Sequence, residues 1–506
     1  MNLTDPKSGA KCGPEELRDL YVRHFGEEPH TVKRLAGAGS NRAYYRLEGP
    51  KGTAIGTVGT VLAENKAFID LSRHFAGKGL AVPSIMEVSA DGMCYLQDDL
   101  GDVSLFGAIQ SSRESGQYSP AHLGLMAESL KMIASIQTSG AEGLDFGVCY
   151  PEPEMNERMI RWDLNYFKYD FLKILGIEID ELSLGREFDA MATRLSTRCR
   201  SAETFMARDF QSRNVMLAEG EKPYLIDFQG GRRGPMEYDV ASFLWQARAS
   251  LSPQNRRDLV EVYICEMRRL MGERFDEAAF RQSLPLMVVF RMLQILGAYG
   301  LRGLSQRRPH FLASIPAALR NLADYLDESR LGAEFPYLRR LADECQQARE
   351  VRDLSMITSV KPMEGVLTVT VSSFSFKRGV PVDLSGNGGG FVFDCRAVHN
   401  PGRYDRYKPL TGRDPEVKDF IEENGEIFSF LENAEALVKA AVARYLERGF
   451  TSLCVCFGCT GGRHRSVYSA DSMARLLRKL FPQIRVVVWH REQEILEEYK
   501  PEIAQR

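Results

Sequence analysis

The spacing of apolar residues changes along the chain and divides it into regions. Residues 32–47, 53–62 and 83–101 hold short runs of alternating or β-branched residues separated by small-residue turns, a pattern that predicts strands. From residue 121 to about 326, apolar residues recur at the three- and four-residue spacing of helices. The pattern therefore predicts a strand-rich lobe, preceded by a helix over residues 14–25 and followed by a lobe of helices.

The pattern changes again in the last third of the chain. Short β-branched strands are expected at residues 366–371 and 391–394, and an amphipathic helix at residues 433–448. A buried strand at residues 452–457 then runs into a glycine-rich loop and a further helix. Strand, loop and helix in this order are typical of an α/β domain that binds an anion.

The two patterns are separated by a charged and polar segment at residues 328–362, and we place the domain boundary within it. The predicted fold class is α/β with two domains. The first domain covers residues 1–345, a linker covers 346–362, and a smaller α/β domain covers 363–506.

Three oxygen-bearing side chains in the first domain have the spacing that phosphoryl transfer uses. Asp209 and Asn214 are five positions apart, and Asp227 follows two short apolar runs that predict strands around a turn at Gly220. In kinases of the protein-kinase type, such a set supplies the base for the acceptor hydroxyl and the oxygen ligands for Mg²⁺. We predict Asp209 as the catalytic base, and Asn214 and Asp227 as Mg²⁺ ligands.

A small-residue turn near the N-terminus is the candidate phosphate loop. Glycine there allows a close approach of the backbone to a phosphate. The following strand, residues 53–62, contains no lysine to pair with the α- and β-phosphates, so the cation that takes this part is open. The predicted nucleotide-binding residues are Gly39, Ser40, Asn41 and Arg42.

On these residues, the chain from about 15 to 330 resembles the aminoglycoside phosphotransferase family, and within it the amino-sugar kinases that phosphorylate the anomeric hydroxyl. The resemblance implies a bilobal, protein-kinase-like α+β domain that uses ATP and Mg²⁺. It also implies that Tyr238 and Asp239 brace the site. One departure is Ala207, which stands where the family often has a histidine.

The glycine-rich loop of the second domain combines three glycines with three basic residues. Backbone N–H groups and the positive end of the following helix dipole would converge on one point there. The spacing of a P-loop is absent. Cys459 and Arg465 instead have the Cys-x5-Arg spacing of cysteine-dependent phosphatases, so a nucleophilic thiolate and a thiol that only lines the pocket both remain open.

Residues from about 365 to 495 resemble the C-terminal domain of the RNase adapter protein RapZ, on Ser373–Lys377, Phe391–Arg396, Asn400-Pro401, Pro409–Gly412 and Gly458–Tyr468. The resemblance implies a ligand, a phosphorylated amino sugar, and, in that family's own context, a small regulatory RNA. RapZ's nucleotide-binding domain is replaced here by the kinase-like domain. The implied phosphosugar-binding residues are Asp394, Arg396, Cys459, Thr460, Gly461, Gly462, Arg463, His464, Arg465 and Ser466.

Composition limits the partners. Lysine and arginine number 65 against 68 aspartate and glutamate, so the formal net charge is −3 and bulk charge gives RNA binding no support. The ten cysteines form no paired framework, and the N-terminus lacks the apolar core of a signal peptide. The apolar run at residues 283–301 contains Arg291 and Gln294, which favours a buried helix over a membrane span. We therefore expect a cytoplasmic protein without a membrane partner.

The sequence predicts an ATP- and Mg²⁺-dependent kinase for a small sugar, fused to a domain that binds a phosphosugar. Two alternatives stay open. In one, the first domain is a degenerate kinase and the protein is a regulator whose second domain binds RNA or protein. In the other, the second domain is a phosphatase that uses Cys459.

Overall fold

The computed structural model describes residues 13–35, 42–361, 363–386, 390–423 and 425–502. The chain forms two compact units. Unit 1 comprises the residues up to Tyr169 together with Ile179–Gly297 and Arg320–Ala342. Unit 2 comprises Asp170–Glu178, Ala298–Leu319 and Asp343–Arg506.

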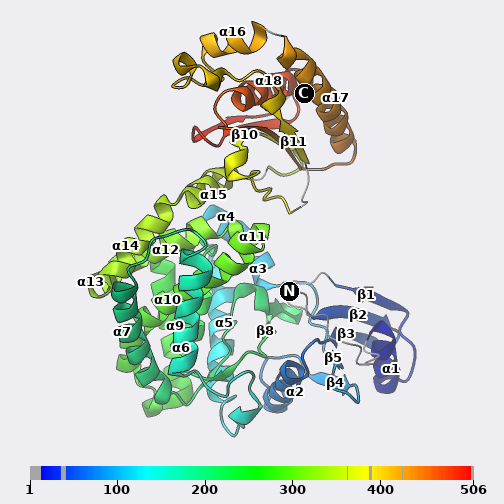
Figure 1. Ribbon diagram of the computed structural model, residues 1–506. Helices are drawn as coiled ribbons and strands as arrows, with labels where there is room; N and C mark the ends of the chain where they lie inside the picture. Colours follow the sequence, from blue (N-terminus) through cyan, green and yellow to red (C-terminus); the bar gives the residue numbers. More distant parts are fainter. Residues whose placement is uncertain (1–12, 36–41, 362, 387–389, 424, 503–506) are drawn as a thin grey trace. The chain divides into compact units, whose positions relative to one another are not determined.

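An antiparallel sheet of five strands opens unit 1, in the order β1-β2-β3-β5-β4 (Figure 1). Helix α1 (Pro14–Phe25) packs on it through Leu17, Leu20 and Tyr21. Gly56 allows this close packing, because a Cβ there would lie within 3 Å of Leu17. The strands are β1 (Thr31–Arg34), β2 (Ala43–Gly49), β3 (Gly52–Val58), β4 (Ile85–Val88) and β5 (Cys94–Gln97).

Helix α2 (Leu62–Gly77) lies between β3 and β4 in the chain and buries Phe68 and Phe75. Both rings pack on Phe228, with centroid distances of 4.8 and 5.7 Å. The aromatic contact therefore joins the strand-rich lobe to the segment that carries Asp227.

Helices make up most of the rest of unit 1 (Figure 1). Ser119 caps α5 and Ser252 caps α9 by accepting a backbone N–H with the hydroxyl. The long helices are α5 (Pro120–Thr138), α6 (Glu157–Tyr166), α7 (Glu181–Arg200), α8 (Glu237–Leu244), α9 (Pro253–Met271), α10 (Glu277–Tyr299), α12 (Ile315–Glu328) and α14 (Pro336–Gln347), the last three of which continue into unit 2 or begin there. The shorter ones are α3 (Leu105–Ala108), α4 (Gln110–Ser115) and α13 (Leu331–Glu334).

Two small antiparallel ladders hold the predicted catalytic segment. Strand β6 (Phe205–Met206) pairs with β9 (Arg232–Arg233), and β7 (Val215–Leu217) pairs with β8 (Pro223–Leu225). Asp209 and Asn214 lie between β6 and β7, and Asp227 follows β8. The strand pairs predicted around Gly220 therefore exist, and they bring the two halves of the segment together.

Unit 2 contains a mixed sheet in the order β11-β12-β10-β13-β14. The first four strands are parallel and β14 is antiparallel to β13. Every residue of β13 is buried, as expected for a strand covered on both faces. The strands are β10 (Thr368–Ser375), β11 (Gly390–Asp394), β12 (Ser452–Cys459), β13 (Arg485–His490) and β14 (Ile495–Tyr499).

Helices α16 (Pro415–Glu423), α17 (Glu426–Glu447) and α18 (Arg465–Leu480) complete this α/β fold (Figure 1). Apolar side chains from α17 and α18 share one core with the strands, including Val438, Val442 and Met473. Unit 2 also holds α11 (Pro309–Leu312) and α15 (Arg349–Ser359), the latter inside the segment predicted as a linker.

Helix α15 is joined to the strand-rich part of unit 2 by ion pairs. Asp353 is buried and accepts hydrogen bonds from Arg378, at 2.5 Å, and Arg491, at 2.9 Å. Arg349 donates to Glu492 at 2.8 Å. The helix is therefore part of the folded domain that follows it.

One helical stretch in the described residues, Glu277–Ser305, is long and apolar enough to span a membrane, and 67% of its most apolar window is buried inside the protein. The buried helix predicted over residues 283–301 is present as part of α10. Among the described residues, eight cysteines carry free thiols, whereas Cys94 is in a disulfide that the sequence did not predict.

Candidate functional site

The backbone of the predicted catalytic loop, which carries Asp209, is held by a buried carboxylate. Asp239, in the first turn of α8, accepts the N–H groups of Ala207 and Arg208 at 2.8 and 2.9 Å. Gln137 donates to the same carboxylate at 2.8 Å. Burial raises the pKa of Asp239 to about 6, and the three hydrogen bonds oppose that rise. Asp239 thus braces the loop as the sequence indicated, and Ala207 takes part through its backbone.

Asp209 presents its carboxylate at the end of this braced loop. Its side chain is 49% exposed, and Oδ1 lies 3.7 Å from Nη2 of the buried Arg291. Nε of Arg291, on α10, donates to the hydroxyl of Ser242 at 3.1 Å, which fixes the guanidinium against α8. A carboxylate that is both exposed and oriented by a buried cation is suited to accept a proton from a bound hydroxyl.

Asn214 and Asp227 lie beside each other across the β7–β8 ladder. Backbone N–H of Ile226 donates to the carbonyl of Asn214 at 2.9 Å, and Asn214 Nδ2 donates to the carbonyl of Asp209 at 2.9 Å. This bond leaves the Asn214 side-chain oxygen for another partner. Burial raises the pKa of Asp227, while a hydrogen bond from Gln229 opposes the rise.

The donor set fits a hard divalent cation. An amide oxygen and a carboxylate are the ligands that Mg²⁺ takes in proteins, with water completing the octahedron. Asp227 has a φ of +61°, a left-handed backbone conformation that a non-glycine residue adopts at a cost. The side-chain oxygen of Gln229 is buried and has no hydrogen-bond partner among the described residues.

Arg42 lies directly before β2 and is buried. Its guanidinium forms an ion pair of 3.4 Å with Glu64 in the first turn of α2. Both side chains act electrostatically on Asp227, Arg42 lowering its pKa and Glu64 raising it. A cation paired with a helix carboxylate is therefore present beside Asp227, although it comes from the residue before β2 and not from β3, where a lysine was expected. The predicted residues Gly39, Ser40 and Asn41 lie outside the described residues.

A second set of charged residues surrounds Asp209, and the sequence did not indicate most of it. Asp163 of α6 is buried and lies 3.7 Å from Arg208, whose φ is +70°. Burial raises the pKa of Asp163. Arg232 is 1% exposed and donates to the carbonyl of Gly230, and burial lowers its pKa to about 10. Arg232 is therefore an interior residue of the site and does not form the solvated pair with Arg233 that is common for adjacent arginines.

The glycine-rich loop of unit 2 wraps around a sulfur atom. Gly462 donates its N–H to Sγ of Cys459 at 3.1 Å, and the hydroxyl of Ser466 lies 3.2 Å from the same atom. Gly462 has a φ of +65°, which favours glycine. Cys459 is 3% exposed, whereas Thr460 and Gly461 face solvent. The loop thus has a buried thiol at its centre and two exposed residues at its rim.

The basic side chains of this loop contact carbonyl groups of the neighbouring segment. Arg465 is buried, and its Nη1 donates to the carbonyls of Arg396 and Val398 at 3.0 and 2.8 Å. The ring of His464 bonds to the carbonyl of Tyr407 at 2.8 Å, and burial lowers the pKa of His464, so that its ring is neutral near pH 7. Arg463 is exposed and donates to the carbonyl of Lys408 at 3.0 Å.

Asp394 and Arg396 form an exposed ion pair of 2.6 Å at the end of β11. The hydrogen bond from Arg396 lowers the pKa of Asp394. Asp394 pairs in register with Gly458 in the sheet, so the ion pair lies next to the start of the loop. The ten residues predicted for the phosphosugar site are thus gathered at one edge of the sheet.

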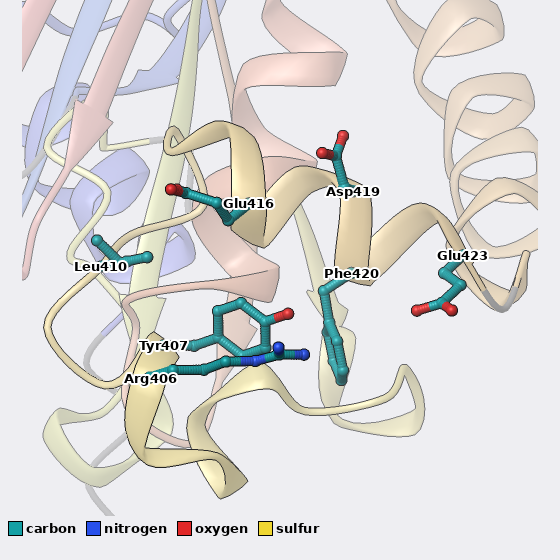
Figure 2. A pocket seen from close by; sticks show the side chains of 7 residues that line it. All are labelled: Arg406, Tyr407, Leu410, Glu416, Asp419, Phe420 and Glu423. Carbon is teal, nitrogen blue, oxygen red and sulfur yellow. The ribbon is translucent and has the colours of Figure 1, made fainter.

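A pocket of about 490 Å³ opens in the same unit (Figure 2). The rings of Tyr407 and Phe420 lie 5.0 Å apart in its wall, and Arg406 stacks on Tyr407 at 4.5 Å. The bond between His464 and the Tyr407 carbonyl connects the pocket wall to the glycine-rich loop. None of its lining residues was predicted as a site residue, although Leu410 lies in the Pro409–Gly412 segment of the RapZ resemblance. The lining residues are Arg406, Tyr407, Leu410, Glu416, Asp419, Phe420 and Glu423.

Two family models match the chain. Residues 31–274 match the phosphotransferase enzyme family, and residues 367–494 match the RapZ C-terminal domain. At the level of families, these matches confirm both resemblances drawn from the sequence. They also confirm the fold class, a protein-kinase-like domain followed by an α/β domain.

Curated relatives carry the name nucleotide-binding protein. The one from Acidobacterium capsulatum is 35% identical over 219 residues, which are 42% of this chain and 66% of the relative. The one from Fervidobacterium nodosum is 36% identical over 132 residues, 26% of this chain and 44% of the relative. The chain therefore spans less than two thirds of either relative.

Solved structures similar to the chain are kinases of small molecules. A putative aminoglycoside phosphotransferase from Ralstonia eutropha aligns over 64% of this chain and 98% of its own, with 13% identity and a TM-score of 0.43. The choline kinase LicA from Streptococcus pneumoniae aligns over 62% and 99%, with 11% identity and a TM-score of 0.42.

Proposed function

We propose that this chain, a phosphotransferase-family kinase domain joined to a RapZ C-terminal domain, transfers the γ-phosphoryl group of ATP to a small sugar. The observation that carries the proposal is the carboxylate of Asp209. It is exposed on a braced loop and lies beside Asn214 and Asp227, the two proposed Mg²⁺ ligands. An acceptor hydroxyl bound there would give its proton to Asp209 as its oxygen attacks phosphorus and ADP leaves.

The nucleotide would be held by residues around Asp227. Bound Mg²⁺ would be held by Asn214 and Asp227 and would neutralise phosphate charge. Arg42 is the cation that supports phosphate binding in the absence of a lysine in β3, because its pairing with Glu64 fixes the guanidinium beside Asp227. Gly39, Ser40 and Asn41 remain proposed phosphate contacts from the sequence.

For the acceptor we propose an amino sugar such as N-acetylmuramate or N-acetylglucosamine, phosphorylated at its anomeric hydroxyl. This choice comes from the family resemblance and from the fusion, because the RapZ-like domain points to amino-sugar phosphates as well. The product of transfer to the anomeric carbon is acid-labile, and its phosphorus couples to the C1 proton in NMR. A stable 6-phosphate would contradict this part of the proposal.

The second domain is proposed to bind the phosphorylated sugar at the edge formed by the loop, Asp394 and Arg396. The exposed Thr460 and Gly461 and the first turn of α18 would contact the phosphate through N–H groups. Such a protein would act on cytoplasmic ATP and metabolites, and we place it in the cytoplasm. RNA is a possible further ligand that the net charge of −3 does not favour.

A second candidate function for this domain is phosphatase activity. Two observations favour it, the N–H of Gly462 and the hydroxyl of Ser466 on Cys459 Sγ, because both would stabilise a thiolate. Against it, Cys459 is 3% exposed and Arg465 is bonded to carbonyls. Hydrolysis of an aryl phosphate by the full chain, lost in Cys459→Ser, would support the phosphatase.

The kinase proposal is tested by a screen of sugars and amino sugars for ADP formation with MgATP. We expect turnover with at least one amino sugar and loss of that turnover in Asp209→Asn. If no sugar causes ADP formation although MgATP binds, the sugar-kinase proposal fails and a non-catalytic regulator becomes the better description.

A further inference from the structure

Gln229 is a partly buried amide beside Asp227, one of the two proposed Mg²⁺ ligands, and no part of the proposed function uses it. Its Nε2 donates to Oδ1 of Asp227 at 2.8 Å. Its other end, Oε1, is buried and accepts no hydrogen bond from any described residue. Buried carbonyl oxygens are nearly always satisfied in folded proteins, so an orphan of this kind points to a donor that binds there.

The orientation of the amide follows from chemistry. An ionised carboxylate can only accept hydrogen bonds, so the NH₂ end of Gln229 contacts Asp227 and the oxygen is the end left for another donor. One oxygen of Asp227 is thereby occupied, and the other stays available to a metal. The bond also restrains a residue whose backbone is in the left-handed region, at φ +61°.

Asn214 shows the same arrangement on the other side of the site. Its Nδ2 donates to the carbonyl of Asp209 at 2.9 Å, and its side-chain oxygen can accept a hydrogen bond or bind a metal. Two amides thus direct their nitrogens to aspartate residues and keep their oxygens for another partner.

We propose that Gln229 is a positioning residue of the metal site. Its N–H fixes the carboxylate of Asp227, and its oxygen accepts a hydrogen bond from water bound to Mg²⁺. Magnesium dehydrates reluctantly and usually keeps several waters, so such a donor accompanies the ion. This inference rests on the proposed function, because it assigns a role at the same metal site.

The test measures metal binding rather than turnover. Mn²⁺ binding to the full chain with ADP is followed by electron paramagnetic resonance for the wild type, Gln229→Ala and Gln229→Met. Loss of a residue that orients a metal ligand typically weakens metal affinity ten- to a hundredfold. We expect that loss in both variants, with metal-free ADP affinity and the unfolding temperature unchanged.

Gln254→Ala is the matched control. Gln254 is exposed, and its Nε2 also donates to an aspartate, Asp258, at 2.7 Å. The control should bind Mn²⁺ as the wild type does. Gln229→Met keeps the side-chain volume and so separates the lost amide from a lost fold if Gln229→Ala is unstable.

Asp227→Ala separates failure of this inference from failure of the proposed function. If Asp227→Ala loses Mn²⁺ binding while Gln229→Met binds it normally, Gln229 has no positioning role and the inference is overturned. If Asp227→Ala and Gln229→Met both bind Mn²⁺ normally, the metal site lies elsewhere, and the proposed kinase site fails with the inference.

Discussion

The loop of Asp209 and the glycine-rich loop of the second domain were both predicted to act on or bind a phosphate group. Their side chains have opposite roles. In the catalytic loop, Asp209 remains exposed because the structural work is done by Asp239, which holds the backbone. In the glycine-rich loop, His464 and Arg465 are turned to carbonyls of the same domain. In the first loop the carboxylate of Asp209 stays accessible to a ligand. In the second loop, two of the three basic side chains stabilise the domain by bonding to its own backbone.

This difference determines which groups could contact an anion at each of the two loops. At the catalytic loop, the groups that would meet ATP are side chains and a metal. At the glycine-rich loop, the available groups are the backbone around Thr460 and Gly461 and the positive end of α18. Glu492 lies against this loop as well, since a Cβ on Gly462 would fall 2.4 Å from its side chain. An anion of a given charge should therefore bind more weakly at the glycine-rich loop than at the loop of Asp209.

The largest effect is expected from Asp209→Asn, which tests whether the first loop works through its side chain. Removing a general base should lower turnover at least about a hundredfold. The fold should remain intact, because Asp239 and not Asp209 braces the loop. Asp276→Asn, which keeps a capping side chain at the start of α10, is the control and should retain full activity, measured as ADP formation.

Arg42→Met tests the cation beside Asp227. A charge-assisted hydrogen bond to phosphate is worth roughly 1.5–3 kcal/mol, so MgATP affinity should fall about ten- to a hundredfold in calorimetry. Arg34→Met, an exposed change on β1, should leave the affinity as it is. Equal affinity in both variants would show that phosphate binding does not depend on Arg42.

Arg465→Ala tests the second loop and should have a smaller effect on ligand affinity, about tenfold. The change removes two hydrogen bonds to backbone carbonyls, one of them buried, so the free energy of unfolding should fall by roughly 2 kcal/mol as well. Arg463→Ala, with one exposed bond, is the comparison. Thermal shift with a sugar phosphate measures both quantities, and a loss of affinity without a loss of stability would instead assign Arg465 to the ligand.

The smallest effect is a pH dependence from His464. Burial lowers the pKa of its ring from the usual 6.5, so the unfolded chain binds the proton more tightly and stability is lost as pH falls below about 6.5. His464→Gln keeps a donor for the Tyr407 carbonyl and should flatten this loss. Urea unfolding at several pH values measures it, and identical curves would mean that the ring does not titrate between pH 5 and 7.

The sequence was informative where chemistry is local. The candidate site residues of the first domain could be predicted because a loop and two short strands place them at a characteristic spacing. They are Asp209, Asn214 and Asp227. The order β11-β12-β10-β13-β14 was not accessible, since strand alternation gives each strand but not its neighbours. The families of both domains followed from motifs, and the family matches confirm them.

Residues that reach the site from elsewhere were missed for a physical reason. Asp163 lies on α6, forty-six positions before Asp209, and only packing shows their proximity. Pairing of Arg42 with Glu64 likewise depends on how α2 lies against the sheet. Side-chain direction was the other limit, because the composition of the glycine-rich loop does not reveal that Arg465 points away from it.

The ion pairs of α15 determine where this protein can be divided. A fragment that begins at residue 363 would lack Asp353 and would leave the buried Arg491 without its carboxylate, while Arg378 would keep only its bond to Glu492. An uncompensated buried cation is strongly destabilising. We therefore expect the smallest stable fragment of the second domain to begin ahead of Arg349, so that α15 and the carboxylate of Asp353 are retained.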